Sequence, residues 1–127
     1  MKAYLDTNVV IRLAIGDLSK ISKEAQQAMD RYDLLISPMV LVELQYAFEI
    51  KRVIRQAEAI FKHLQRTIDL QICQLPFEYI ASAALLESWT RDAFDRIIVS
   101  QARCAQNSFL ITADEKIQKH YMQTICS

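Results

Sequence analysis

The sequence predicts an α/β protein with a mainly parallel central sheet, and three features support this class. Short apolar runs alternate along the 127 residues with longer segments of helical periodicity. The chain has one glycine and two prolines, too few for the many tight turns of an all-β protein. Strands that alternate with helices favour a parallel sheet covered by helices on both faces.

The first third of the chain contains two expected strands and two expected helices. An apolar strand ends at Asp6, and the helical spacing that follows ends at Gly16, a suitable C-cap. Ser19 or Ser22 can cap the second helix. The expected elements are strand 2–5, helix 8–15, a helix from residue 19 or 22 to about residue 32, and strand 34–36.

The remaining elements follow the same alternation. Ser37 and Pro38 start a helix, because serine is a favoured N-cap and proline fits the first helical position. Pro76 starts a later helix, and Asp114 starts the last one. The expected elements are helix 38–50, helix 53–66, strand 68–72, helix 76–87, helix 93–106, strand 108–111, helix 114–120 and an edge strand 123–125.

The composition limits the possible functions of the protein and the cellular compartment in which we expect it. The single Gly16 excludes the glycine-rich loops that hold nucleotide phosphates. Fifteen basic residues balance fifteen acidic ones, so a polyanion needs a local patch or a metal ion. Three widely spaced cysteines indicate reduced thiols. With no signal-peptide core and no membrane-length apolar stretch, we expect a soluble cytoplasmic protein.

Four acidic residues occupy positions that favour a ligand site. Asp6 and Asp114 each lie just beyond the carboxyl end of an expected strand, where parallel sheets bind ligands. Asp92 and Asp95 lie at the start of the helix that leads into the second of these strands. Each of the four can also be explained as an N-cap or as a first-turn acid near a helix dipole.

Glu43 is different, because it is in the middle of a helix and cannot be an N-cap. We place it on the apolar face formed by Met39, Val42, Tyr46 and Ala47. A buried carboxylate is costly unless it is paired, protonated or bound to a metal. The alternative to a site role is a buried salt bridge, for example with Arg12 or Arg96.

A cluster of carboxylates suits a hard divalent cation such as Mg²⁺ or Mn²⁺, which prefers oxygen ligands. Such an ion promotes hydrolysis of a phosphodiester. Zinc is a poor match, since His63 and His120 are isolated in separate helices. No Ser-His-Asp or Cys-His arrangement is evident.

These segments together resemble the PIN-domain family, and in particular the VapC-type toxins. The resemblance covers almost the whole chain through Met1–Asn8, the SPMVLVEL segment 37–44, the TRDAFDRIIVSQA segment 90–102 and the LITADEK segment 110–116. It implies one PIN domain over residues 1–127, folded as a three-layer α/β/α sandwich with a mainly parallel sheet of four to five strands. It also implies a Mg²⁺- or Mn²⁺-dependent endoribonuclease, a homodimer, and neutralisation by a VapB-type antitoxin.

The resemblance assigns roles to particular residues. The expected catalytic residues are Asp6, Glu43, Asp95 and Asp114, and the expected metal ligands are these four together with Asp92. Thr7, Asn8, Thr112 and Arg96 are expected to support them, the first three by orienting the carboxylates. We place Asp95 at the core position of the third acid and Asp92 as an accessory.

The chain differs from the family pattern at two positions, and two other functions are possible. The chain has Thr90 and Ala93 where the subgroup commonly has histidine and proline, which alters the helix entry without removing an acid. A phosphoacceptor receiver domain has a similar size, but it needs an acidic pair after the first strand, and only Asp6 is there. A non-catalytic PIN-like RNA-binding module is the second alternative.

Overall fold

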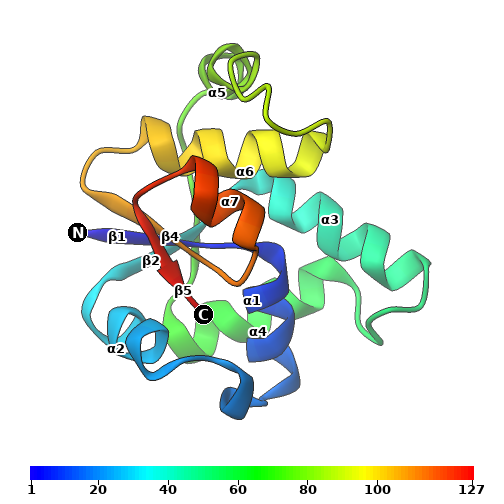
Figure 1. Ribbon diagram of the computed structural model, residues 1–127. Coiled ribbons are helices and arrows are strands. Elements are labelled where there is room, and N and C mark those ends of the chain that lie inside the picture. The colour runs from blue at the N-terminus through cyan, green and yellow to red at the C-terminus, as the bar shows by residue number, and fades with distance from the viewer.

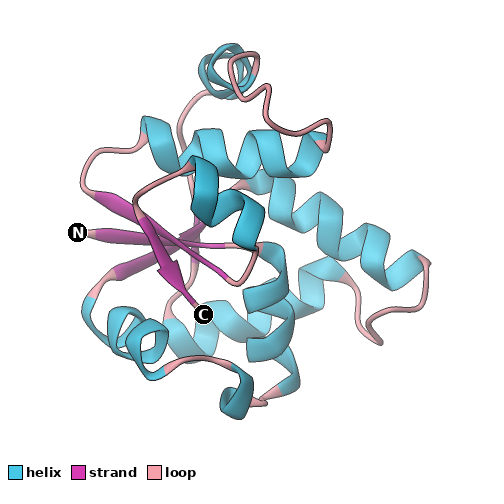
Figure 2. Ribbon diagram, viewed as in Figure 1, coloured by secondary structure: helices cyan, strands magenta, loops and turns pink.

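The computed structural model describes all 127 residues, and its centre is a sheet of five parallel strands in the order β3-β2-β1-β4-β5. Helices cover both faces (Figure 1; Figure 2). This is the expected α/β/α arrangement. The elements are β1 (Lys2–Leu5), α1 (Thr7–Ile15), η1 (Leu18–Lys20), α2 (Lys23–Arg31), β2 (Asp33–Ile36), α3 (Pro38–Glu49), α4 (Ala57–Ile68), β3 (Gln71–Ile72), α5 (Phe77–Ala84), α6 (Ala93–Cys104), β4 (Ser108–Thr112), α7 (Glu115–His120) and β5 (Thr124–Cys126).

The two layers of helices meet the sheet through its apolar side chains. In Figure 1, α1, α2 and α4 lie below the strands, and α5 and α6 lie above them. One continuous core of 25 buried residues fills the space between these layers, including Leu5, Ile36 and Ile111 from the strands. No helix is both long enough and apolar enough to cross a bilayer.

The strand order excludes the receiver-domain alternative. Receiver domains place their second strand at the sheet edge, in the order 2-1-3-4-5. Here β1 is central, between β2 and β4, and β3 is an edge strand. The central position of β1 brings the ends of β1 and β4 together, since Leu5 is paired with Ile111.

Three expected boundaries between residues 53 and 72 were wrong. The fourth helix begins at Ala57 and not at residue 53, and it continues to Ile68, which we had expected in a strand. Asp69 then adopts a left-handed conformation with φ of 55° and ends the helix. The following strand is therefore only Gln71–Ile72, because the apolar side chains before it belong to the buried face of α4.

Candidate functional site

The first part of the site is the junction where β1 and β4 end side by side. Asp6 caps α1 and is only 6% exposed. Its Oδ1 accepts a hydrogen bond of 2.8 Å from the backbone N–H of Thr7, and its Oδ2 accepts one of 2.7 Å from Oγ1 of Thr112. Thr112 also accepts a 3.0 Å hydrogen bond from the backbone N–H of Asp114. One hydroxyl group therefore joins the two strand ends and both acids.

Glu43 reaches this junction from α3. Oγ1 of Thr7 donates a hydrogen bond to Oε1 of Glu43, which is partly buried. The carboxylate makes no ion pair, so the alternative of a salt bridge with Arg12 or Arg96 is wrong. Arg12 instead donates to the carbonyl of Lys20.

The helix face predicted for Glu43 was partly wrong. The buried face of α3 is formed by Val40, Leu44 and Ala47, whereas the side chains of Val42 and Tyr46 are 56% and 53% exposed. Glu43 lies at the border between the buried and exposed faces. The apolar character of almost the whole helix had hidden which side contacts the core.

The start of α6 supplies Asp92 and Asp95. Asp92 is the N-cap, and its Oδ1 accepts from the backbone N–H groups of Phe94 and Asp95 at 2.8 and 3.2 Å. Its own N–H donates to Oγ1 of Thr90 at 3.1 Å. Asp95 accepts no hydrogen bond from the protein. The aromatic rings of Phe94 and Tyr46 lie 6.4 Å apart and link α6 to α3.

Burial and the charges of neighbouring acids raise the pKa values of three acids in this region, Asp6, Glu43 and Asp95. The pKa of Asp95 is raised to about 7, first by burial and then by the charges of Asp92, Asp6, Asp114 and Glu43. Burial also raises the pKa of Asp6 in spite of its two hydrogen bonds, with further contributions from Asp114 and Asp92. The pKa of Glu43 is raised by burial, and Asp6 and Asp92 add to this effect.

The donor atoms fit a hard divalent cation. Asp92 and Asp114 use only Oδ1 for helix capping, and Glu43 uses only Oε1, so each keeps one carboxylate oxygen without a hydrogen-bond donor. Both oxygens of Asp95 are in this state. The structure does not gather three acidic, histidine or cysteine side chains closely enough to share one ion. Ion binding therefore requires the carboxylates to move towards one another.

The capping and ligand interpretations of these aspartates are compatible. Asp6, Asp92 and Asp114 are all N-caps, of α1, α6 and α7. Capping fixes one oxygen of Asp92 and of Asp114 against backbone N–H groups and holds each carboxyl group at the carboxyl-terminal side of the sheet.

Four polar residues had been predicted to support these acids, and the structure gives each a partner. Thr7 and Thr112 donate to the carboxylates of Glu43 and Asp6. Arg96 has no acidic partner, and its Nε donates to the carbonyl of Thr90 at 2.9 Å. Asn8 accepts a 2.8 Å hydrogen bond from Nη2 of Arg52, which belongs to a basic cluster with Lys51 and Arg55 after α3.

Comparisons with known proteins identify the family and the fold of the chain. The PIN domain family matches residues 3–121. No curated protein matches the chain. A crystal structure of VapBC2 from Rickettsia felis, bound to a DNA fragment from their promoter, contains a chain that superimposes with a TM-score of 0.68. The two chains are 21% identical, and the match covers 100% of this chain and 98% of that one.

Proposed function

Because the chain belongs to the PIN-domain family, we propose that it is a metal-dependent endoribonuclease and the toxin of a VapBC-type toxin–antitoxin pair. The observation that carries the proposal is the environment of Asp95, whose carboxyl group is repelled by Glu43 of α3 and by three N-cap residues, Asp6, Asp92 and Asp114. Carboxylates this close repel one another when all are ionised, and a divalent cation bound between them removes this repulsion.

The proposed ligands are the carboxylates of Asp6, Glu43, Asp95 and Asp114, with Asp92 as an accessory, and the proposed ion is Mg²⁺ or Mn²⁺. When bound, such an ion polarises a phosphoryl oxygen and acidifies water. The protein's own contribution is to orient the ligands. Thr7 and Thr112 hold Glu43 and Asp6 in place through hydrogen bonds. Loss of such an orienting hydrogen bond typically lowers metal affinity by roughly 10- to 100-fold.

Protons compete with the ion for the same oxygens. Asp95, with a pKa of about 7, holds a proton for a large fraction of the time near neutral pH. Metal binding has to displace this proton, so the apparent affinity for the ion rises with pH. Asp95 is for this reason the residue through which pH should act most strongly on the site.

We further propose that the protein forms a homodimer and is neutralised by a VapB-type antitoxin in a reducing cytoplasm. The structural neighbour is one component of a VapBC assembly, and all three cysteines here are free thiols. A self-associating surface is supported by apolar side chains that α3, α5 and the turn after α5 leave exposed: Val42, Tyr46, Phe77, Tyr79, Leu85 and Leu86. Light scattering of the purified protein would test the dimer.

RNA cleavage tests the central proposal and its alternative. The wild-type protein should cut a single-stranded RNA in the presence of Mg²⁺ or Mn²⁺ and stop when the ion is chelated. The Asp6→Asn variant should be inactive under all conditions. Equal cleavage by this variant would reveal a contaminant or another site. A wild type that binds RNA without cutting it would favour the non-catalytic binding module.

A further inference from the structure

Arg52 lies beside the acidic site, and its backbone position is fixed by the end of α3. Lys51 adopts a left-handed conformation with φ of 64°, which reverses the chain after the helix. The backbone N–H of Arg52 then donates a 2.8 Å hydrogen bond to the carbonyl of Ala47. The turn therefore presents the Arg52 side chain at a defined point next to α1.

The guanidinium group of Arg52 is held by the same helical turn that carries Asp6. Its Nη2 donates a 2.8 Å hydrogen bond to Oδ1 of Asn8, two residues after Asp6. The positive charge is close enough to lower the pKa of Glu43, although burial outweighs this effect. Arg52 nevertheless forms no ion pair with Glu43 or with any other carboxylate. Most of its five N–H donors remain available at an exposed position.

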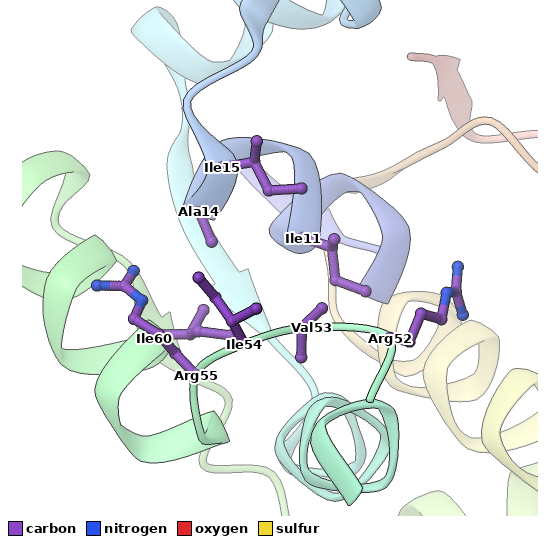
Figure 3. A pocket seen from close by; sticks show the side chains of 8 residues that line it. All are labelled: Ile11, Ala14, Ile15, Arg52, Val53, Ile54, Arg55 and Ile60. Carbon is purple, nitrogen blue, oxygen red and sulfur yellow. The ribbon is translucent and has the colours of Figure 1, made fainter. Parts of the chain in front are cut away.

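Figure 3 shows how Arg52 differs from Arg55, the next arginine along the chain. The two side chains lie at opposite ends of an apolar groove lined by residues that include Ile11, Val53 and Ile54. The guanidinium of Arg52 has a partner in the first turn of α1, whereas Arg55 donates no hydrogen bond to the acidic site. The structure therefore separates two residues that look equivalent in the sequence.

An acidic pocket needs a nearby cation if it is to accept RNA. The chain has no net charge to attract a polyanion, and the five clustered carboxylates repel phosphate. The other two arginines near this pocket, Arg91 and Arg96, donate to the backbone carbonyls of the loop before α6. Arg52 is the one whose guanidinium is fixed by a side chain beside Asp6, and a guanidinium can bind phosphate through two parallel hydrogen bonds.

We propose that Arg52 binds a phosphate of the RNA next to the acidic pocket, and that Asn8 is a positioning residue that orients its guanidinium group. This inference rests on the proposed function, because it assigns the substrate contact of the same site. It predicts that Arg52 contributes to RNA affinity independently of the metal ion.

Binding of a fluorescein-labelled, single-stranded 12-nucleotide RNA of mixed sequence in EDTA tests the inference without cleavage. The Arg52→Ala variant should bind about tenfold more weakly, as loss of a charge-assisted hydrogen bond implies. The slope of the logarithm of the RNA-binding constant against the logarithm of salt concentration should become shallower, by the amount that about one phosphate contact contributes. The matched control is Arg55→Ala, which removes the same charge three residues away and should bind within about twofold of wild type.

Two further variants separate binding from a general structural effect. Arg52→Lys keeps the charge but loses the planar fork, so it should recover part of the affinity. Asn8→Ala should weaken binding in the wild-type background and have no further effect when combined with Arg52→Ala. In cleavage assays with Mn²⁺, Arg52→Ala should raise KM with little change in kcat.

The outcomes distinguish this inference from the proposed function. A wild type that binds RNA but never cleaves it would overturn the nuclease and leave the role of Arg52 standing if Arg52→Ala alone loses affinity. An active enzyme whose Arg52→Ala and Arg55→Ala variants bind RNA equally well would overturn the role of Arg52 alone. A wild type that cleaves RNA with Mn²⁺ but binds none in EDTA would overturn the metal-independent role of Arg52 alone, and one that neither binds nor cleaves RNA would overturn both.

Discussion

The hydroxyl group of Thr112 lies 2.7 Å from Oδ2 of Asp6, and this single hydrogen bond joins the ends of the two central strands across 106 positions of the sequence. The bond lowers the pKa of Asp6 against the effect of burial, so it favours the ionised form that a cation needs. Thr112 is itself fully buried. Its methyl and hydroxyl groups can be tested separately.

Replacement of Thr112 by valine keeps the shape of the side chain and removes the hydroxyl group. We expect Thr112→Val to weaken the affinity for Mn²⁺ by about tenfold or more and to shift the rise of activity to higher pH. Thr112→Ser retains the hydroxyl and should bind Mn²⁺ nearly as the wild type does. Calorimetric titration measures the affinity, and equal affinities for the valine and serine variants would contradict the role of the hydrogen bond.

The helix-capping role of Asp114 and its proposed role as a metal ligand can be separated by two substitutions. Asparagine caps helices as well as aspartate does, so Asp114→Asn should change the free energy of unfolding by little, whereas Asp114→Ala should lower it by about 1 kcal/mol. Both variants should lose RNA cleavage, because both lose the carboxylate. Urea denaturation and cleavage assays on the same preparations give the comparison. Retained activity in Asp114→Asn would mean that Asp114 is only a cap.

The metal-free protein should become less stable as pH rises. The pKa of Asp95 is about 7 in the folded protein, against 3.8 for the unperturbed group, and those of Asp6 and Glu43 are also raised. Between about pH 4 and pH 7 the folded state therefore binds more protons than the unfolded state, and the free energy of unfolding falls with increasing pH. Above that window, the contribution of Asp95 is constant.

Thermal unfolding in EDTA at several pH values measures this dependence. The Asp95→Asn variant should show a smaller fall in Tm from pH 5 to pH 8, and added Mg²⁺ should raise the Tm of the wild type more at pH 8 than at pH 5. A Tm of the metal-free protein that rises with pH over this window would show that the carboxylates are not mutually destabilising.

The parts of the fold that follow local chemistry could be predicted from the sequence. Caps such as Ser37 and Asp114 act through hydrogen bonds to their own helices, so their identity is enough to locate a helix start. The order of the strands and the short β3 could not be obtained in this way. They depend on which apolar side chains of residues 57–72 contact α1 and the sheet, and both a helix and a strand can bury such a run.

The site was partly predictable for a related reason. Parallel strands end at one edge, so the convergence of Asp6 and Asp114 follows from topology alone. The sequence places Arg52 in a basic cluster with Lys51 and Arg55 that could contact an RNA backbone, but such a run after a helix is more often solvated, and the sequence does not distinguish Arg52 from Arg55. The significance of Arg52 depends on a contact with Asn8 across 44 positions, created by the packing of α3 against α1.

A buried charge outside the acidic site gives a prediction about stability. Glu87 is only 4% exposed, and it lies in the loop that leads to Asp92. Its Oε1 is 2.6 Å from Nε of Arg103 on α6, and its Oε2 accepts a 2.5 Å hydrogen bond from the indole N–H of Trp89. The pair therefore holds the 85–92 loop against α6.

Substitution of Arg103 alone should lower the free energy of unfolding more than substitution of Arg103 and Glu87 together. Arg103→Met leaves Glu87 buried without a counter-charge and should lower the free energy of unfolding by about 2 kcal/mol, less than for a fully buried pair because Arg103 is partly exposed. Glu87→Gln keeps a hydrogen-bond acceptor for Trp89 and should restore part of this loss when combined with Arg103→Met. Urea denaturation of the two single variants and the double variant measures the coupling. Strictly additive effects would mean that Glu87 and Arg103 do not stabilise each other.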